Sequence, residues 1–136
     1  MGRSSRAKGA VYERELAKLI TQYGWRAIRT GHYQSRPGHD ASDVEARDLP
    51  IHWESKATER AQIRDWLAQA IGDCRSDQFP VVAWRAKHTP WVGIMKLKDL
   101  LTILQFTDLD ALRAHIGESL VEEPDRAESV ESEAAE

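Results

Sequence analysis

The sequence predicts an α/β fold in which a five-stranded mixed sheet is flanked by helices. Segments whose apolar residues recur at helical spacing are interspersed with shorter segments that alternate in polarity or are continuously apolar, as strands are. Their order along the chain is α-β-β-β-α-β-β-α-α, which implies a sheet with helices packed on it. A length of 136 residues, with 41% hydrophobic and 30% charged residues, suits one globular domain with a buried core.

The chain begins with a polar segment followed by a helix. Residues 1–7 are polar and include Arg3 and Arg6, which predicts a flexible basic arm. Residues 9–22 carry an approximate i, i+4 apolar stripe, and Gly24 then supplies the residue type that commonly ends a helix. We therefore predict the first helix over residues 9–22.

Three strands are predicted next. Residues 25–30 alternate in polarity and predict the first strand. After a loop over residues 31–42, residues 43–47 and 51–57 predict two further strands, with a turn over 48–50 between them. We expect these two strands to pair as a hairpin that turns its polar face to a cleft and packs its other face on a helix.

The second half of the chain is predicted to add one helix, two strands and two more helices. The segment 81–84 is almost continuously apolar, as expected of a strand buried on both faces. Thr107 is a favourable residue to cap the last helix, and Gly117 is a favourable residue to end it. The predicted elements are a helix over residues 60–75, strands over 81–84 and 91–95, and helices over 98–105 and 107–116.

The net charge of −3 hides an uneven distribution along the chain. Residues 118–136 hold eight acidic residues and one basic residue, for −7, whereas residues 1–117 hold 18 basic and 14 acidic residues, for +4. We predict a folded domain over residues 1–117 and an acidic tail over 118–136, disordered at least in its distal half. A mildly basic domain is compatible with nucleic-acid binding.

Cysteine content and hydropathy limit the classes of protein. The single cysteine, Cys74, excludes an internal disulfide framework and a cysteine-based zinc site, and a reducing compartment is expected. No apolar run approaches the ~20 residues of a membrane span, and the N-terminus lacks the apolar segment of a signal peptide. We expect a cytoplasmic protein without a membrane partner.

The strand over residues 51–57 carries the most informative polar side chains. Alternate residues of a strand share a face, so His52, Glu54 and Lys56 are expected to lie together. Taken alone, this pattern indicates an exposed strand face with an ion pair that contributes little to stability. Asp43 changes the interpretation, because hairpin geometry can place its carboxylate beside that of Glu54.

The carboxylates of Asp43 and Glu54 predict a metal site. Two adjacent carboxylates repel each other unless a cation joins them. Oxygen ligands that leave positions open for water and phosphate favour Mg²⁺, which polarises a scissile phosphate and lowers the pKa of a bound water. Lys56 can orient that water or stabilise charge in the transition state. This is the chemistry of a phosphodiesterase, and Glu13 on the first helix is a candidate third carboxylate.

The histidines and the loop over residues 31–42 add weaker signals. A loop of this length between regular elements is often functional, and His32 and His39 within it are candidates for contact with DNA. His52 is a candidate for lining the cleft. His88 and His115 are expected at the surface, since the histidine spacing matches no zinc motif.

These residues resemble the PD-(D/E)xK nuclease superfamily, whose members have a restriction-endonuclease-like α/β/α core. Asp43, followed after ten residues by Glu54-Ser55-Lys56, fits the split signature of that superfamily. The resemblance is closest to the archaeal-type Holliday junction resolvases and their phage relatives, over about residues 8–100. The other segments that carry it are Lys8-Gly9-Ala10-Val11-Tyr12-Glu13-Arg14-Glu15-Leu16, Gly24-Trp25-Arg26-Ala27-Ile28-Arg29, Phe79-Pro80-Val81-Val82-Ala83-Trp84 and Trp91-Val92-Gly93-Ile94.

The resemblance implies a role for each matched residue. Asp43 and Glu54 would bind Mg²⁺, for which Mn²⁺ substitutes, together with the backbone carbonyl of Ser55. Glu13 would help to hold the metal or its water, and Lys56 would be the catalytic lysine. The residues expected to bind DNA are Lys8, Arg14, Arg29 and Arg36.

The resemblance also implies a homodimeric endonuclease that cuts four-way junctions in DNA recombination, in a host cytoplasm if the protein is phage-encoded. Two departures from the archaeal proteins leave the substrate open: the loop over residues 31–42 is longer, and the acidic tail has no counterpart. The alternative is a phage-type or restriction-like nuclease of the same fold that acts on duplex, nicked or single-stranded DNA. A non-enzymatic DNA-binding module is disfavoured, because Glu13, Asp43, Glu54 and Lys56 are all present.

Overall fold

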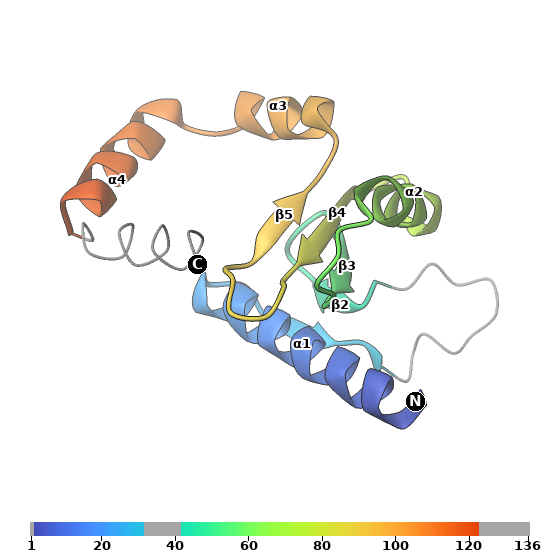
Figure 1. The fold of residues 1–136 in the computed structure, drawn as a ribbon. Helices are drawn as coiled ribbons and strands as arrows, with labels where there is room; N and C mark the ends of the chain where they lie inside the picture. Colours follow the sequence, from blue (N-terminus) through green and yellow to red (C-terminus); the bar gives the residue numbers. More distant parts are fainter. Residues whose placement is uncertain (1, 32–41, 123–136) are drawn as a thin grey trace. The chain divides into compact units, whose positions relative to one another are not determined.

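The computed structural model describes the backbone of residues 2–31 and 42–122. The chain divides into two compact units, Met1–Lys96 and Leu97–Glu136. The elements follow the predicted order α-β-β-β-α-β-β-α-α, and the strands of the described residues all lie in the first unit (Figure 1). The α/β class predicted from the sequence is confirmed.

A five-stranded mixed sheet forms the centre of the first unit. Its strands are β1 (Ala27–Arg29), β2 (Val44–Ala46), β3 (Ile51–Lys56), β4 (Phe79–Trp84) and β5 (Val92–Ile94), and they lie side by side in that order. The β3–β4 pair is parallel, and the other neighbours are antiparallel. Val44 lies opposite Trp53 in the β2–β3 pair, which confirms the predicted hairpin.

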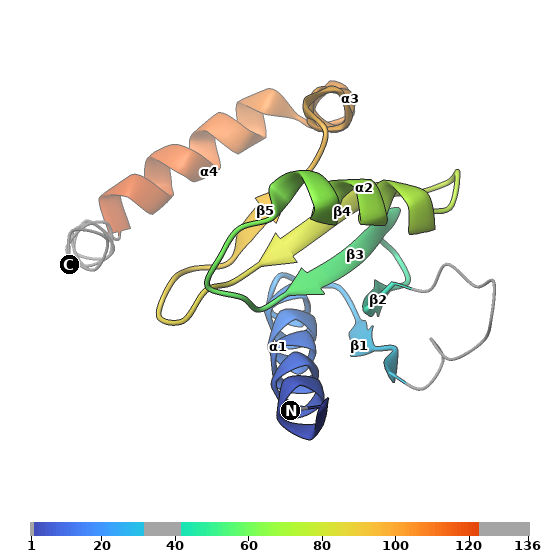
Figure 2. The ribbon, with the colours of Figure 1, turned by 45° about the vertical axis from the view of Figure 1, so that its right-hand side comes forward.

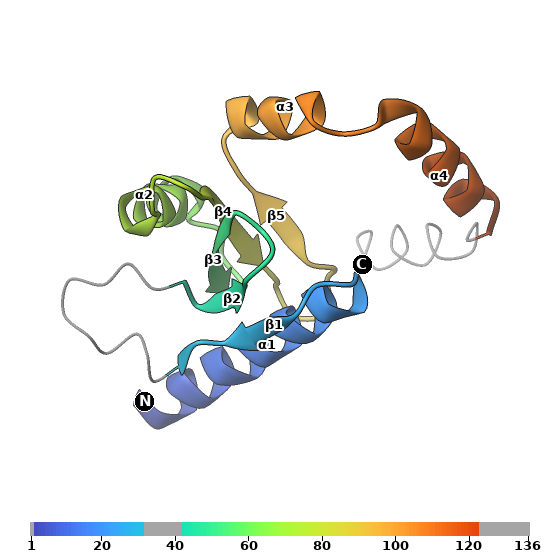
Figure 3. The same ribbon diagram turned by 180° about the vertical axis from the view of Figure 1, so that it is seen from behind.

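Helices α1 (Gly2–Gln22) and α2 (Ile63–Asp73) lie on opposite faces of the sheet (Figure 2). Helix α1 runs along β1, as the view from behind shows (Figure 3), and buries Leu16 in a cluster on which Trp53 of β3 packs. Helix α2 contacts β3 and β4 and buries Trp66. Because β3 is the middle strand between these two helices, both of its faces are covered.

Helix α1 begins earlier than the sequence predicts. It starts at Gly2, so the prediction of a flexible arm over residues 1–7 is wrong for the described residues. Arginine, alanine and lysine have high helix propensity, and the segment forms a helix although its polar sequence predicted a flexible arm. The predicted end is confirmed: Gly24 has a left-handed φ of 103°, and its N–H donates to the Thr21 carbonyl over 3.0 Å.

The second unit contains helices α3 (Leu97–Gln105) and α4 (Leu109–Glu122). Asp108 caps α4 in place of the predicted Thr107, since its carboxylate accepts the Ala111 N–H over 3.0 Å. Gly117 does not end α4, because an interior glycine costs a helix only about 1 kcal/mol. The predicted domain boundary after residue 117 stays a prediction, and residues 123–136 of the predicted tail lie outside the described residues.

Other predicted elements differ from the observed ones mainly at their ends. Strand β1 and helix α2 are shorter than predicted, whereas β4 starts earlier, at Phe79. The four central residues of β4 are buried, as its apolar sequence predicts. His88 and His115 are exposed, as expected. Within the described part of the chain, no helix has the length and apolar character needed to cross a membrane.

Candidate active site

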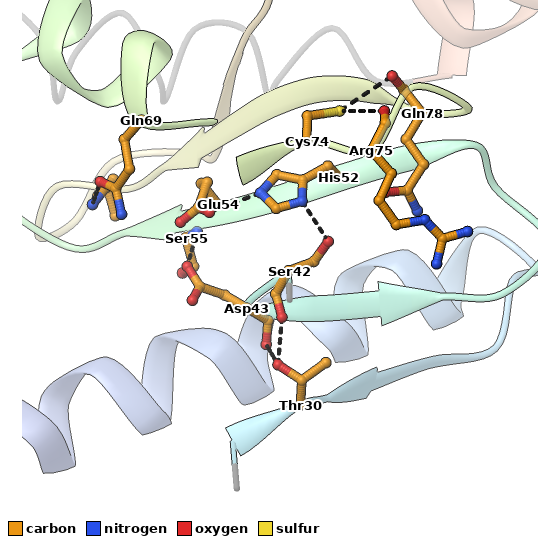
Figure 4. A network of polar contacts seen from close by, with 11 residues as sticks. Thr30, Ser42, Asp43, His52, Glu54, Ser55, Gln69, Cys74, Arg75 and Gln78 are labelled. Atoms are coloured by element: carbon orange, nitrogen blue, oxygen red, sulfur yellow. Dashed lines mark hydrogen bonds and ion pairs between the residues drawn. The ribbon is translucent and has the colours of Figure 1, made fainter. Parts of the chain in front are cut away.

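Asp43 lies immediately before β2 and extends its pairing with β3. Its backbone N–H donates to the Trp53 carbonyl over 2.9 Å. Its carboxylate Oδ2 accepts a hydrogen bond of 2.8 Å from the backbone N–H of Ser55. Ser55 stands between Glu54 and Lys56 on β3, so this bond holds the Asp43 carboxylate against the Glu-x-Lys segment (Figure 4).

Glu54 is almost fully buried, with 4% of its surface exposed. Burial raises the pKa of its carboxyl group above the ordinary value, and the neighbouring Asp43 raises this pKa further through its charge and a hydrogen bond. A hydrogen bond from His52 opposes the shift. The two carboxyl groups therefore share one site, where their mutual repulsion disfavours a second negative charge.

His52 connects Glu54 to β2. Its Nε2 lies 2.8 Å from Glu54 Oε1, and its Nδ1 lies 2.9 Å from the Ser42 hydroxyl (Figure 4). The prediction that His52 lines a cleft is wrong, because the side chain is 0% exposed. The polar face of β3 turns inward at His52 and Glu54 because helices cover both faces of this middle strand.

Lys56 completes the polar face of β3 and is half-buried. Its Nζ donates to Gln69 Oε1 of α2 over 2.9 Å, a contact between residues 13 positions apart. Sequence reasoning missed Gln69, which reads as an ordinary polar residue on the outer side of an amphipathic helix. The same reasoning missed Ser42, whose only signal is its position next to Asp43.

Glu13 and Arg29 form an ion pair between α1 and β1. Arg29 Nε lies 2.6 Å from Glu13 Oε2, and the side chains are 31% and 16% exposed, respectively. Burial raises the pKa of Glu13, the Arg29 hydrogen bond lowers it, and the charge of Asp43 raises it. The negative charge of Asp43 therefore acts on the carboxylate of Glu13, which also binds the Arg29 guanidinium.

The remaining DNA-binding candidates are exposed or lie outside the described residues. Arg14 and Lys8 are exposed on α1, and the Lys8 ammonium lies 5.9 Å from the centre of the Tyr12 ring. Arg36 belongs to residues 32–41, which lie outside the described part of the chain, as do His32 and His39.

Thr30 fixes the start of β2 relative to the end of β1. Its buried hydroxyl donates to the Ser42 carbonyl and lies 3.1 Å from the Asp43 carbonyl. Its backbone N–H also donates to the Asp43 carbonyl, over 3.1 Å. The two ends of the segment between residues 30 and 42 are thereby tied together beside the carboxylates.

The donor set fits a magnesium ion bound by two carboxylates. Among residues 2–31 and 42–122, no group of three or more His, Cys, Asp and Glu side chains is arranged to hold a metal, so Glu13 does not join Asp43 and Glu54 in a three-ligand cluster. Mg²⁺ is typically bound through one or two carboxylates and keeps several waters. The pKa of Glu54 is raised mainly by burial and further by the charge of Asp43, and a bound cation would oppose both effects.

The mixed sheet, with Asp43 held against Glu54-Ser55-Lys56, defines the class of protein: a PD-(D/E)xK endonuclease of the restriction-endonuclease-like fold. A model of the phage putative PDDEXK endonuclease family matches residues 4–130, and the chain belongs to this family.

Comparisons with individual proteins agree with this class. The structure is similar to that of Hjc, a Holliday junction resolvase from the archaeal hyperthermophile Archaeoglobus fulgidus, with a TM-score of 0.50 and 20% sequence identity. The match covers 62% of this chain and 72% of the Hjc chain, and it shows a common fold. A search of curated proteins finds no match.

Proposed function

We propose that this endonuclease is a Mg²⁺-dependent DNA hydrolase that cuts branched DNA, with Asp43 and Glu54 as the metal ligands and Lys56 as the catalytic lysine. The observation that carries the proposal is the 2.8 Å hydrogen bond from the Ser55 N–H to Asp43 Oδ2. It joins the two carboxylate-bearing strands at the position of the Glu-x-Lys sequence. Mn²⁺ is expected to substitute for Mg²⁺ at such oxygen ligands.

Each residue of this site has a separate proposed role in phosphodiester hydrolysis. Asp43, Glu54 and the Ser55 carbonyl would hold the cation, which polarises the scissile phosphate and lowers the pKa of a bound water. The Lys56 ammonium is directed by Gln69 and supplies positive charge to the phosphate oxygens as the attacking oxygen adds. Glu13 supports the site from α1, where its carboxylate binds Arg29 and lies near enough to Asp43 for the Asp43 charge to raise its pKa.

DNA binding is proposed for the basic residues around this site. Arg29 is paired with Glu13, whose pKa is raised by the charge of Asp43, so its guanidinium can exchange Glu13 for a phosphate bound near the carboxylates. Arg14 and Lys8 are exposed on the same helix as Glu13 and would contact neighbouring phosphates. Arg36 is proposed as a further contact from the segment between β1 and β2.

A homodimer that acts on four-way junctions is the proposed form of the enzyme. Hjc is a Holliday junction resolvase, and a common fold makes the junction the first substrate to test. The second unit exposes many large apolar side chains, including Phe106 at 87%, and an apolar surface of this kind suits contact with a second copy. The other large apolar side chains that are exposed among the described residues of this unit are Leu97, Leu100, Leu101, Leu109, Leu112 and Ile116.

The second candidate is a nuclease of the same family that acts on duplex, nicked or single-stranded DNA. The family match is compatible with it, because the family description specifies an endonuclease and names no DNA structure. In either case we place the reaction in the cytoplasm and assign it to a nuclease domain over residues 1–117, with residues 118–136 as an acidic tail.

Cleavage of two labelled substrates distinguishes these candidates. A four-way junction and a linear duplex with the same arm sequence are each incubated with the full chain and Mg²⁺. A resolvase cuts the junction at symmetric positions and leaves the duplex largely intact. Equal cleavage of both substrates would refute the junction proposal while supporting the second candidate.

A further inference from the structure

We infer that His52 is a positioning residue which, anchored by Ser42, holds the Glu54 carboxylate in the orientation that binds the divalent cation. The inference rests on the proposed function, because it assigns a role in the metal site to a histidine that is not itself a ligand. It also explains why an imidazole ring lies in the core of this small domain.

The first observation is that three polar side chains are buried in one continuous chain of contacts. Ser42 is 4% exposed, His52 is 0% exposed and Glu54 is 4% exposed. The two ring nitrogens of His52 lie 2.9 Å from the Ser42 hydroxyl and 2.8 Å from Glu54 Oε1. Both nitrogens thus have partners, which offsets the cost of removing the ring from water.

The second observation is the chemistry of the partners, which sets the direction of these hydrogen bonds. When Glu54 is ionised, as a metal ligand is, its carboxylate can only accept, so His52 Nε2 would carry the hydrogen and donate to Glu54 Oε1. In the neutral ring Nδ1 is then an acceptor, to which the Ser42 hydroxyl donates. Figure 4 shows the contacts from Ser42 through His52 to Glu54, and with Glu54 ionised the donors would run in that direction.

The third observation is that this chain spans the hairpin which carries both proposed ligands. Ser42 precedes Asp43 on one side, and its carbonyl accepts from the buried Thr30 hydroxyl. His52 and Glu54 belong to the same face of β3, two residues apart. The fixed ring consequently links the backbone beside one metal ligand to the carboxylate of the other.

Fixing Oε1 determines how the Glu54 carboxylate presents its oxygens to a cation. A carboxylate is free to turn about its terminal bond unless a hydrogen bond or packing holds it. A side chain that orients a ligand in this way typically changes metal affinity by about 10- to 100-fold when it is removed. His52 is expected to act at this level without contacting the substrate.

Isothermal titration of the DNA-free full chain with MgCl₂ tests the inference. His52→Leu removes both hydrogen bonds and should raise the Kd for Mg²⁺ by about 10- to 100-fold. His52→Gln, whose amide nitrogen can replace Nε2 as the donor to Glu54, should recover most of this affinity. Ser42→Ala removes only the anchor and should weaken binding by a smaller factor.

Ile20→Ala is the matched control. Ile20 is buried in the α1 cluster, so its truncation should destabilise the fold without removing a contact of this network. Its Kd should equal that of the wild type, whereas an increase as large as that of His52→Leu would overturn the inference. An unchanged Kd in folded His52→Leu would also overturn it. If His52→Leu does not fold, unchanged binding by Ser42→Ala overturns it instead.

Mg²⁺ binding by the wild type and by the variants separates the metal site from the role of His52. A wild-type chain that binds no divalent cation refutes the metal site itself and the role of His52 with it. If the wild type binds Mg²⁺, Glu54→Gln does not, and His52→Leu binds it with an unchanged Kd, only the positioning role of His52 is refuted.

Discussion

Two acid–base pairs flank Asp43, one buried and one partly buried, and they differ in how they are built. Glu54 and His52 lie two residues apart on one strand, whereas Glu13 and Arg29 come from a helix and a strand 16 residues apart. Burial raises the pKa of both glutamates, and the basic partner opposes the shift in each case. The pairs differ in charge, because Arg29 is a permanent cation and His52 can act as a neutral donor.

This difference separates two tasks that a nuclease must perform. A histidine that acts as a neutral donor would orient Glu54 and leave its negative charge available to a metal ion. A guanidinium neutralises Glu13, and the same guanidinium can move to a phosphate when DNA arrives. The proposed division gives metal binding to the Glu54–His52 pair and phosphate binding to the Glu13–Arg29 pair.

Replacing each glutamate by glutamine is the strongest test of this assignment. Glu54→Gln should reduce the cleavage rate by at least about 100-fold, because it removes a metal ligand. Glu13→Gln should reduce it by only about 10-fold, since Glu13 acts from outside the ligand set. Single-turnover cleavage measures both effects, with the exposed Glu45→Gln on β2 as the control. Equal losses in the two variants would contradict the division of tasks.

Lys56→Ala tests whether the lysine beside Glu54 acts in the cleavage step or in metal binding. The variant should lose about 10²- to 10³-fold in cleavage rate, because it removes a positive charge from the transition state. Mg²⁺ binding should be unchanged, since Lys56 is not a ligand. Gln69→Ala should show the same pattern at a smaller size, because it only releases Nζ. Loss of Mg²⁺ binding in Lys56→Ala would show that the lysine supports the ligands instead.

Arg29→Gln probes the other pair. If Arg29 moves to a phosphate, the variant should bind DNA several-fold more weakly, and the slope of log K against log salt should fall by about one. Fluorescence anisotropy in Ca²⁺ measures both quantities without cleavage. Arg26→Gln, an exposed arginine three residues earlier, serves as the control. An unchanged salt slope in Arg29→Gln would assign the arginine to the fold alone.

The pH dependence of stability gives the smallest expected effect. In the metal-free protein, burial raises the pKa of Glu54 above 4.5, so the folded state binds this proton more tightly than the unfolded state does. Stability should therefore fall as pH rises from 4.5 through the raised pKa. Glu54→Gln should unfold at a higher temperature than the wild type at pH 7, and the difference should shrink as pH falls below 4.5. A difference that is independent of pH would contradict this origin.

The sequence predicted the parts of this molecule that depend on short-range periodicity. Alternation along β3 placed His52, Glu54 and Lys56 on one face, and the turn after β2 predicted the hairpin. The burial of His52 was not predictable, because it depends on the position of β3 in the middle of the sheet. The Glu13–Arg29 and Lys56–Gln69 contacts were missed for a similar reason, since they join elements whose packing no local pattern encodes.

Cation-dependent cleavage by the wild-type chain tests the central claim most directly. The purified protein is incubated with a labelled four-way junction and with supercoiled plasmid, first in EDTA and then with MgCl₂ in excess over the EDTA. We expect no cleavage of either DNA in EDTA and cleavage of at least one of them once Mg²⁺ is supplied. Undiminished cleavage in EDTA, or a folded protein that cuts neither DNA with Mg²⁺ or Mn²⁺, would contradict the account.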